Sequence, residues 1–218
     1  MRSVSSHGPI AKPPRSELER KIRVGYFSMD FREHSLPTLV TGLFESHDRS
    51  RFEIYGMSFG PDTKDHVRKR LERAFDKFID VRDQSDEEIA ALSRRLEIDI
   101  AVDLAGHTRF SRVGIFALQA APVQVNFLGY PGTMGSDYHD YIIADRIVIP
   151  DEARKHFSER VVYLPDCYQP NVSARNVSNR VFTRAELGLP ATGFVYCSFN
   201  NNYKISPTTF DSWMRILA

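Results

Sequence analysis

The sequence predicts an α/β fold built on a parallel, Rossmann-like sheet, and three observations support this. From Lys21 onward, short apolar stretches alternate with segments of helical periodicity, as in successive βαβ units. The stretches YIIA and VVYL are largely apolar, which is typical of strands buried on both faces of a sheet. Hydrophobic residues make up 42% of the chain and charged residues 26%, proportions that exclude wholesale disorder.

The expected strands and helices follow one another in a regular order. The first strand is Ile22–Ser28, and a helix near Leu36–His47 follows it. The start of the helix at Asp86–Leu96 is the most clearly marked, because Ser85 lies three residues before Glu88, the spacing of a capping box. The other strands are expected at Phe52–Phe59, Phe78–Val81, Asp99–Leu104, Val123–Leu128, Asp140–Ala144 and Arg160–Leu164, and the other helices near Thr63–Phe75 and Arg109–Gln119.

Composition divides the chain into four segments. Residues 1–20 are polar, contain three prolines and show no periodicity, so we expect a flexible leader. Residues 21–165 carry the α/β pattern and form the expected main lobe. Residues 166–182 are polar and predict a linker. Residues 183–218 carry signals for the beginning of a second α/β unit.

Those signals are local and of three kinds. The string TRAELGL predicts a short helix, and Gly193–Phe199 (GFVYCSF) predicts a strand. Ser206 is an expected N-cap with Pro207 at the first helical position, which predicts a final helix up to Ala218. One strand and one helix cannot bury a core of their own, so the second unit is expected to be truncated.

Charge and cysteine content exclude several functional classes. The 29 Lys and Arg residues against 28 Asp and Glu residues give a net charge of +1, which does not suggest a nucleic-acid binder. The apolar runs are far shorter than the roughly 18 residues of a membrane span, and no signal peptide precedes them. We therefore expect a cytoplasmic protein without a membrane partner. Cys167 and Cys197 are too few for a disulfide scaffold or a structural zinc site.

Histidines and carboxylates follow two of the expected strands at their carboxyl ends, where open α/β sheets bind ligands. His34 follows the first strand, with Asp30 four residues before it, and either accepts a proton near neutral pH or is a helix-capping or solvated histidine. Asp103 and His107 flank the end of a later strand. They either form an imidazole base oriented by a carboxylate or serve as a turn cap beside a solvent-facing histidine.

Two further regions suit an anion. The loop at 129–135 contains Gly132 and Thr133, and its backbone N–H groups could hold a phosphate, although it lacks the G-x-G-x-x-G spacing and plain turn chemistry also explains it. Lys204 lies beside the helix start at Ser206, where free N–H groups favour phosphate, unless it is an ordinary surface lysine. The chain has no Asp-x-Asp, so no divalent-metal clamp is predicted.

Four strings of the sequence together resemble one known family. VGYFSMDFREHS, DLAGHTR, APVQVNFLGYPGTMGSDYHDYIIAD and FVYCSFNNNYKISP resemble the bacterial members of the O-linked N-acetylglucosamine transferase/SPINDLY-like family, glycosyltransferase family 41. The resemblance covers residues 21–218 in the same order. It implies a GT-B arrangement of two Rossmann-like lobes, of which this chain holds the N-terminal catalytic lobe and only the start of the nucleotide-binding lobe.

The resemblance also implies an activity. It implies inverting, metal-independent transfer of N-acetylglucosamine from a uridine diphosphate donor (UDP-N-acetylglucosamine) to Ser/Thr hydroxyls of a protein or peptide acceptor. No other cofactor is implied, and tetratricopeptide repeats commonly precede the catalytic region. This chain alone is expected to be incomplete and inactive, and to bind uridine diphosphate weakly or not at all.

Individual residues match the family's motifs. The histidine of D-F-x-x-H matches His34, and the phosphate-binding lysine of Y-K-I matches Lys204. Asn201 takes the place of an amide that is often glutamine in relatives, and Asp103 with His107 matches the bacterial form D-L-x-G-H-T. Two alternatives stay open: a family member with a different sugar or acceptor (O-fucosyl or N-glucosyl transfer), and a non-catalytic α/β interaction module.

Overall fold

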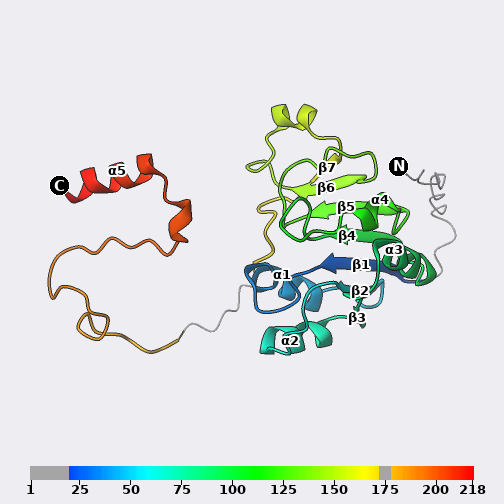
Figure 1. The fold of residues 1–218 in the computed structure, drawn as a ribbon, viewed down its shortest axis with the longest axis horizontal. Helices are drawn as coiled ribbons and strands as arrows, with labels where there is room; N and C mark the ends of the chain where they lie inside the picture. The colour runs from blue at the N-terminus through cyan, green and yellow to red at the C-terminus, as the bar shows by residue number, and fades with distance from the viewer. Residues whose placement is uncertain (1–19, 172–177) are drawn as a thin grey trace. The chain divides into compact units, whose positions relative to one another are not determined.

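A computed structural model describes residues 20–171 and 178–218 of the chain (Figure 1). The chain divides into two units, residues 1–174 and 175–218, which we call the sheet unit and the C-terminal unit. The leader expected at 1–20 falls almost entirely outside the described residues, as do positions 172–177 of the expected linker. No helix in the described part is long and apolar enough to cross a membrane.

The sheet unit contains a seven-stranded sheet in the order β3-β2-β1-β4-β5-β6-β7, with every neighbouring pair parallel (Figure 1). The chain runs outward from β1 to β3 and then returns to place β4 on the other side of β1. The order therefore reverses between β1 and β4, and such a switch point opens a crevice at the carboxyl ends of the strands. The strands are β1 (Ile22–Ser28), β2 (Phe52–Ser58), β3 (Lys77–Asp80), β4 (Ile100–Asp103), β5 (Val123–Phe127), β6 (Tyr141–Ala144) and β7 (Arg160–Tyr163).

Helices pack on both faces of this sheet, because successive side chains of each strand point to opposite faces. Tyr26 joins an apolar cluster with residues of α1 and α2, while its neighbour Phe27 joins a second cluster with residues of α3 and α4. The helices of the sheet unit are α1 (Ser35–Glu45), α2 (His66–Ala74), α3 (Asp86–Arg95) and α4 (Gly114–Ala117), with the 3₁₀ turn η2 (Asp151–His156). The C-terminal unit contains the 3₁₀ turn η3 (Asn202–Lys204) and α5 (Pro207–Leu217). The predicted α/β class is confirmed.

One predicted helix of the sheet unit is much shorter than expected. The pattern at Arg109–Gln119 predicted a full helix, yet α4 covers only Gly114–Ala117. Phe110 and Gln119 have φ angles of 65° and 53°, in the left-handed region that a right-handed helix cannot contain. The segment before α4 is instead a series of turns, and this brings residues 108–110 to the carboxyl end of β4.

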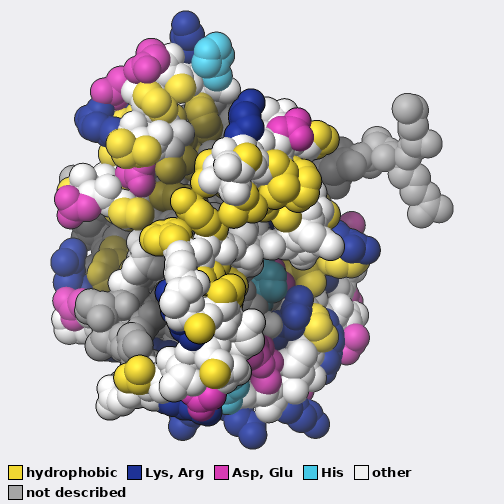
Figure 2. Space-filling view, turned by 90° about the vertical axis from the view of Figure 1, so that its left-hand side faces the viewer, with side chains coloured by type: hydrophobic (Ala, Val, Ile, Leu, Met, Phe, Trp, Pro, Cys, Tyr) yellow, Lys and Arg dark blue, Asp and Glu magenta, His cyan; other side chains and the backbone are white. Residues whose placement is uncertain are grey.

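The C-terminal unit differs more strongly from the prediction. The strand expected at Gly193–Phe199 does not form, and TRAELGL makes only a hydrogen-bonded turn. A strand needs a neighbour to pair its N–H and C=O groups, and the described residues of this unit provide none. Its side chains are accordingly exposed, with Phe199 at 95%, and apolar side chains lie at the surface of this unit (Figure 2). The helix α5 forms because its hydrogen bonds are internal and Ser206 caps it as predicted.

Candidate functional site

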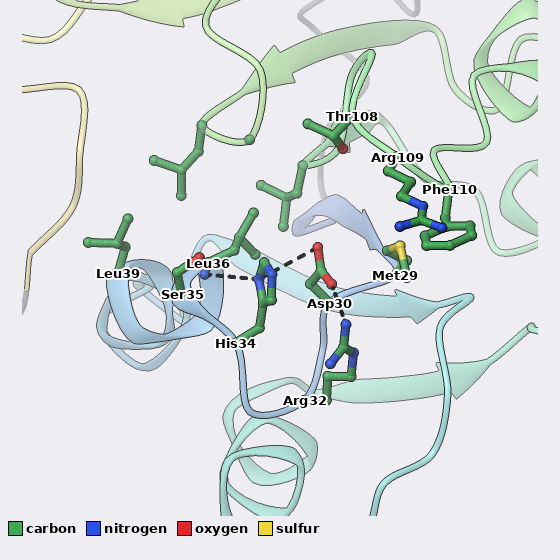
Figure 3. Close-up of a pocket in the computed structure, with 13 residues that line it drawn as sticks. Met29, Asp30, Arg32, His34, Ser35, Leu36, Leu39, Thr108, Arg109 and Phe110 are labelled. Carbon is green, nitrogen blue, oxygen red and sulfur yellow. Dashed lines mark hydrogen bonds and ion pairs between the residues drawn. The ribbon is translucent and has the colours of Figure 1, made fainter. Parts of the chain in front are cut away.

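A cavity of about 390 Å³ lies at the carboxyl ends of β1 and β4, the switch point of the sheet (Figure 3). The segment after β1 supplies one wall and the turns after β4 supply the other. Backbone from the end of β5 completes it. The lining residues are Met29, Asp30, Arg32, His34, Ser35, Leu36, Leu39, Leu104, Thr108, Arg109, Phe110, Leu128 and Gly129.

His34 lies in the wall formed by the segment after β1. It is the N-cap of α1, in extended conformation, and its Nδ1 accepts the Leu36 N–H at 3.4 Å. The same Nδ1 lies 3.7 Å from Oδ2 of Asp30, and the two side chains are 40% and 18% exposed. Nε2 of His34 has no partner among the described residues. The interpretation of His34 as a helix cap is confirmed, and its role as a proton acceptor stays a prediction for a residue that also lines a cavity.

The carboxylate of Asp30 is held from two sides. Its Oδ1 accepts a hydrogen bond from the Arg32 guanidinium at 3.2 Å, and its backbone N–H donates to Oγ of Ser28 at 2.9 Å. The Arg32 guanidinium thereby fixes the orientation of the Asp30 side chain. In Figure 3 the His34 ring and the Arg109 guanidinium lie on either side of the Asp30 carboxylate.

Asp65, the N-cap of α2, fastens the segment that carries His34. Its Oδ2 accepts the Glu33 N–H at 2.9 Å, and its Oδ1 accepts the Arg68 N–H at 2.7 Å. Burial alone would raise the pKa of Asp65, but hydrogen bonds from the Thr63 hydroxyl and from these backbone N–H groups lower that pKa to about 2. The start of α2 is thereby tied to the residue before His34.

Strained backbone forms part of the opposite wall. Phe110 has a φ of 65° and Leu128 a φ of 73°, a conformation that costs a bulky side chain of order 1–3 kcal/mol. Phe110 is exposed, and the Arg109 guanidinium stacks over its ring at 4.5 Å from the centroid. Gly129 is required there, since a Cβ at this position would come within 2.0 Å of the Leu104 carbonyl oxygen. Two strained residues and one obligatory glycine thus lie around a single cavity.

Asp103 and His107 do not form the base that their spacing allowed. Asp103 is buried, and its Oδ1 accepts the N–H groups of Ala105 and Gly106 at 2.9 and 3.0 Å, so it caps the turn after β4. His107 is exposed, and its Nε2 donates to the carbonyl of Met134 at 3.0 Å. The alternative interpretation, a turn cap beside an exposed histidine, therefore describes these two residues. Neither of them lines the cavity.

The sequence reasoning missed the actual partner of Asp103. Nε2 of His139 lies 3.4 Å from Oδ2 of Asp103, and the two side chains are 0% and 3% exposed. Nδ1 of His139 contacts the Ser136 hydroxyl at 3.1 Å, and its ring packs on Phe116. The only signal for this pair is a histidine just before a buried strand in DYHDY.

Gly132 and Thr133 also lie outside the lining of the cavity. The Gly132 carbonyl accepts a hydrogen bond from Nδ2 of Asn126 at 3.1 Å. The Thr133 hydroxyl donates to the carboxylate of Glu159 at 2.8 Å, and Glu159 is itself buried. Side chains of the sheet unit therefore hold this loop in place, and its role in binding an anion stays a prediction.

Asn201 and Lys204 belong to the C-terminal unit. Both are exposed, Lys204 lies in η3, and Asn201 caps that turn without a side-chain hydrogen bond. Nζ of Lys204 lies 6.0 Å from the centroid of the Tyr203 ring. Ser206 then caps α5 by accepting the Thr209 N–H at 3.2 Å. An exposed cationic side chain thus precedes the N-terminus of a helix within two residues, the arrangement that suits a phosphate.

Comparison with known proteins identifies the family. The sequence profile described as Glycosyl transferase family 41 matches residues 6–173 and 169–218. The chain belongs to glycosyltransferase family 41. A Probable UDP-N-acetylglucosamine--peptide N-acetylglucosaminyltransferase SEC of Arabidopsis thaliana is 33% identical over 204 residues, which are 91% of this chain and 21% of that protein. A Probable UDP-N-acetylglucosamine--peptide N-acetylglucosaminyltransferase SPINDLY of the same plant is 34% identical over 92% of this chain and 22% of its own length.

A solved structure agrees with this assignment. An O-GlcNAc transferase of Thermobaculum terrenum, determined as a mutant, superposes with a TM-score of 0.70 at 35% identity, over 75% of this chain and 31% of that chain. The sheet unit is therefore a Rossmann-like lobe of the kind found in GT-B glycosyltransferases. The chain spans about a fifth of the length of the two plant relatives, 21% and 22%.

The cavity of this family 41 chain combines an imidazole with charged side chains. Arg32 and Arg109 contribute positive charge, and Asp30 contributes one negative charge that Arg32 largely neutralises. His34 offers an imidazole nitrogen without a described partner beside that carboxylate. The arrangement can hold a polar group, such as a hydroxyl, and take up its proton.

Proposed function

We propose that this chain contributes the proton-accepting wall of a protein O-glycosyltransferase, which transfers N-acetylglucosamine from UDP-N-acetylglucosamine to Ser or Thr hydroxyls. The observation that carries the proposal is the place of His34, in a cavity at the switch point between β1 and β4, with Asp30 beside its ring. Family membership supplies the reaction type. The names of the plant relatives supply the donor and the peptide acceptor.

The chemistry requires one base and one stabiliser of negative charge. The acceptor hydroxyl loses its proton to Nε2 of His34 while its oxygen attacks the anomeric carbon of the sugar. The bond from that carbon to the diphosphate oxygen breaks, and its electron pair leaves with the diphosphate. Attack from the face opposite the leaving group inverts the configuration at the anomeric carbon.

Lys204 and the N-terminus of α5 are the proposed stabilisers of the leaving diphosphate. An ammonium group and free backbone N–H groups stabilise charge that develops in the transition state. They would take the place of a divalent metal ion, in keeping with a sequence that has no Asp-x-Asp. In a polypeptide that transfers sugar, replacing Lys204 with Ala should abolish transfer and leave the circular dichroism spectrum unchanged. Unaltered turnover in that variant would exclude the phosphate role.

The experiment that tests the function is a transfer assay with several sugar nucleotides. The 218-residue chain, and any longer polypeptide that its reading frame encodes, is incubated with Ser/Thr peptides and UDP-N-acetylglucosamine, UDP-glucose or GDP-fucose. From a polypeptide with a complete donor site, we expect peptides that gain one N-acetylhexosamine on a hydroxyl, as read by mass spectrometry. Transfer of glucose or fucose instead would show that the donor is not the proposed UDP-N-acetylglucosamine. Absence of transfer with every donor and polypeptide would favour an interaction module.

A further inference from the structure

The Nδ1 atom of His34 faces two partners that require opposite proton states. The Leu36 N–H, at 3.4 Å, can bond only to a bare nitrogen that accepts. The carboxylate of Asp30, at 3.7 Å, can bond only to a nitrogen that carries a proton and donates. A neutral ring has one proton, so it can satisfy one partner at a time.

The choice decides what the other ring nitrogen can do. If Nδ1 accepts from Leu36, the proton of the neutral ring is on Nε2, and Nε2 can only donate. If Nδ1 donates to Asp30, Nε2 is bare and can accept the proton of a hydroxyl. Only the second tautomer is a base towards a group in the cavity, so a helix cap and a proton acceptor compete for one atom.

Three features of the site favour the second tautomer. Arg32 orients the Asp30 carboxylate by a hydrogen bond of 3.2 Å, and a hydrogen bond to an ionised acceptor is roughly twice as strong as one between neutral groups. The Leu36 N–H belongs to the first turn of α1, where water can replace a lost cap. Both contacts of Nδ1 are long, so a small rotation of the half-exposed ring suffices to close the bond to Asp30.

We propose that Asp30 is a positioning residue, which holds neutral His34 in the tautomer with the proton on Nδ1. Nε2 then accepts the proton of the acceptor hydroxyl, and the resulting imidazolium keeps its Nδ1–H directed at Asp30. The catalytic consequence rests on the proposed function, whereas the tautomer is a property of this chain alone. Arg32 orients Asp30 in turn, as the other charged group in direct contact with it.

The tautomer can be read directly from nitrogen chemical shifts. In the ¹⁵N-labelled chain above about pH 8, where an ordinary imidazole is neutral, two-bond ¹H–¹⁵N correlations distinguish the protonated from the bare ring nitrogen. We expect a protonated Nδ1 and a bare Nε2 for His34 of the wild-type chain. In Asp30→Asn the side-chain amide can donate to Nδ1, so the proton should move to Nε2.

Glu33→Gln is the matched control. Like Asp30→Asn, it removes one negative charge, here from the residue next to His34. The Glu33 side chain is exposed, and Glu33 contacts Asp65 only through its backbone N–H. Its tautomer should equal that of the wild type. A wild-type ring with its proton on Nε2 would overturn the inference without any variant. A proton that stays on Nδ1 in Asp30→Asn would overturn it as well.

A kinetic measurement then separates this inference from the proposed function. In a polypeptide that transfers sugar, Asp30→Asn should lower kcat by about 10- to 100-fold, at or below the lower limit of the ~10²–10⁴-fold worth of a general base, and leave the KM for the acceptor unchanged. An unchanged kcat would overturn the positioning role. If the wild type shows the Nδ1–H tautomer but no polypeptide that contains this chain transfers sugar, the proposed function is overturned and the tautomer assignment stays intact.

Discussion

Two histidine–carboxylate pairs lie at the carboxyl ends of neighbouring strands, and their surroundings are opposite. Asp30 and His34 follow β1, with side chains 18% and 40% exposed and 3.7 Å between Oδ2 of Asp30 and Nδ1 of His34. Asp103 ends β4 and faces His139 at 3.4 Å, with side chains 3% and 0% exposed. The first pair lines a cavity, whereas the second is enclosed by Phe116 and the turn after β4.

The difference shows that the residue types alone do not make a base. The imidazole of His139 is close to a carboxylate but has no route to a substrate, and its other nitrogen already contacts Ser136. In contrast, Nε2 of His34 has no hydrogen-bond partner among the described residues and lies in a ring that lines the cavity. The buried pair therefore has a structural role, and the pair at the cavity is the one for which we propose a chemical role.

The largest effect on stability is expected at the buried pair. Asp103→Ala removes the acceptor of two backbone N–H groups and the partner of His139, so it should lower the free energy of unfolding by about 3 kcal/mol. Asp30→Ala, at the cavity, should cost less than about 1 kcal/mol. Urea denaturation of both variants measures the difference. Equal losses would mean that the two pairs do not differ in the way their burial indicates.

A smaller effect on stability is expected at Asp65, whose carboxylate accepts the backbone N–H of Glu33 in the cavity wall. Hydrogen bonds lower the pKa of Asp65 to about 2, below the value near 3.8 of a free carboxyl group, so its contribution is complete above about pH 4 and is lost as the pH falls through 2. Because Asp65 is partly exposed to solvent, about 1 kcal/mol is expected rather than the full value of the shift. Unfolding of the wild type and Asp65→Asn between pH 5 and 2.5 should converge. Parallel curves would contradict this.

A third histidine provides a weaker, purely structural comparison. Burial lowers the pKa of His47, which donates from Nδ1 to the Leu43 carbonyl and accepts the Tyr26 hydroxyl at Nε2. The fold therefore prefers neutral His47, so its contribution is complete above the unfolded value of about 6.5 and declines as the pH falls below it. His47→Gln, which can keep both bonds, should show a flatter loss of stability from pH 7.5 to 5. Identical slopes would disprove the assignment.

The smallest effect on stability is expected at His34 itself. Asn is a better N-cap than His, so His34→Asn should keep α1 capped and change the free energy of unfolding by less than about 0.5 kcal/mol. Thermal denaturation and circular dichroism measure this. A loss above about 2 kcal/mol would mean that His34 is mainly structural.

Local signals predicted much of the fold because their physical causes are local. The capping box of Ser85 and Glu88 is present, and Ser206 with Pro207 begins α5 as expected. Each strand of the sheet unit begins and ends within about one residue of its predicted limits, since apolar runs bounded by turns mark buried strands. The strand at Gly193–Phe199 failed because its signal depends on partners that the C-terminal unit does not supply.

Contacts between distant residues could not be predicted in the same way. His139 meets Asp103 only because β4 and β5 pair in the register that places Asp103 beside Asn126, which brings the following loop back over β4. No residue type around Phe110 predicts its left-handed conformation. That conformation is incompatible with a right-handed helix, so α4 is shorter than predicted. The position of His34 was predictable because strand, loop and cap are consecutive.

The most direct test of the account is sugar transfer by His34→Asn, compared with wild type and with His139→Phe as the control at the buried pair. The account predicts that His34→Asn keeps its fold but lowers kcat at least about 100-fold, the minimum worth of a general base. His139→Phe, where it folds, should keep most of its turnover. A His34→Asn enzyme that transfers within about threefold of the wild type would contradict the central claim that this cavity takes up the proton of the acceptor hydroxyl.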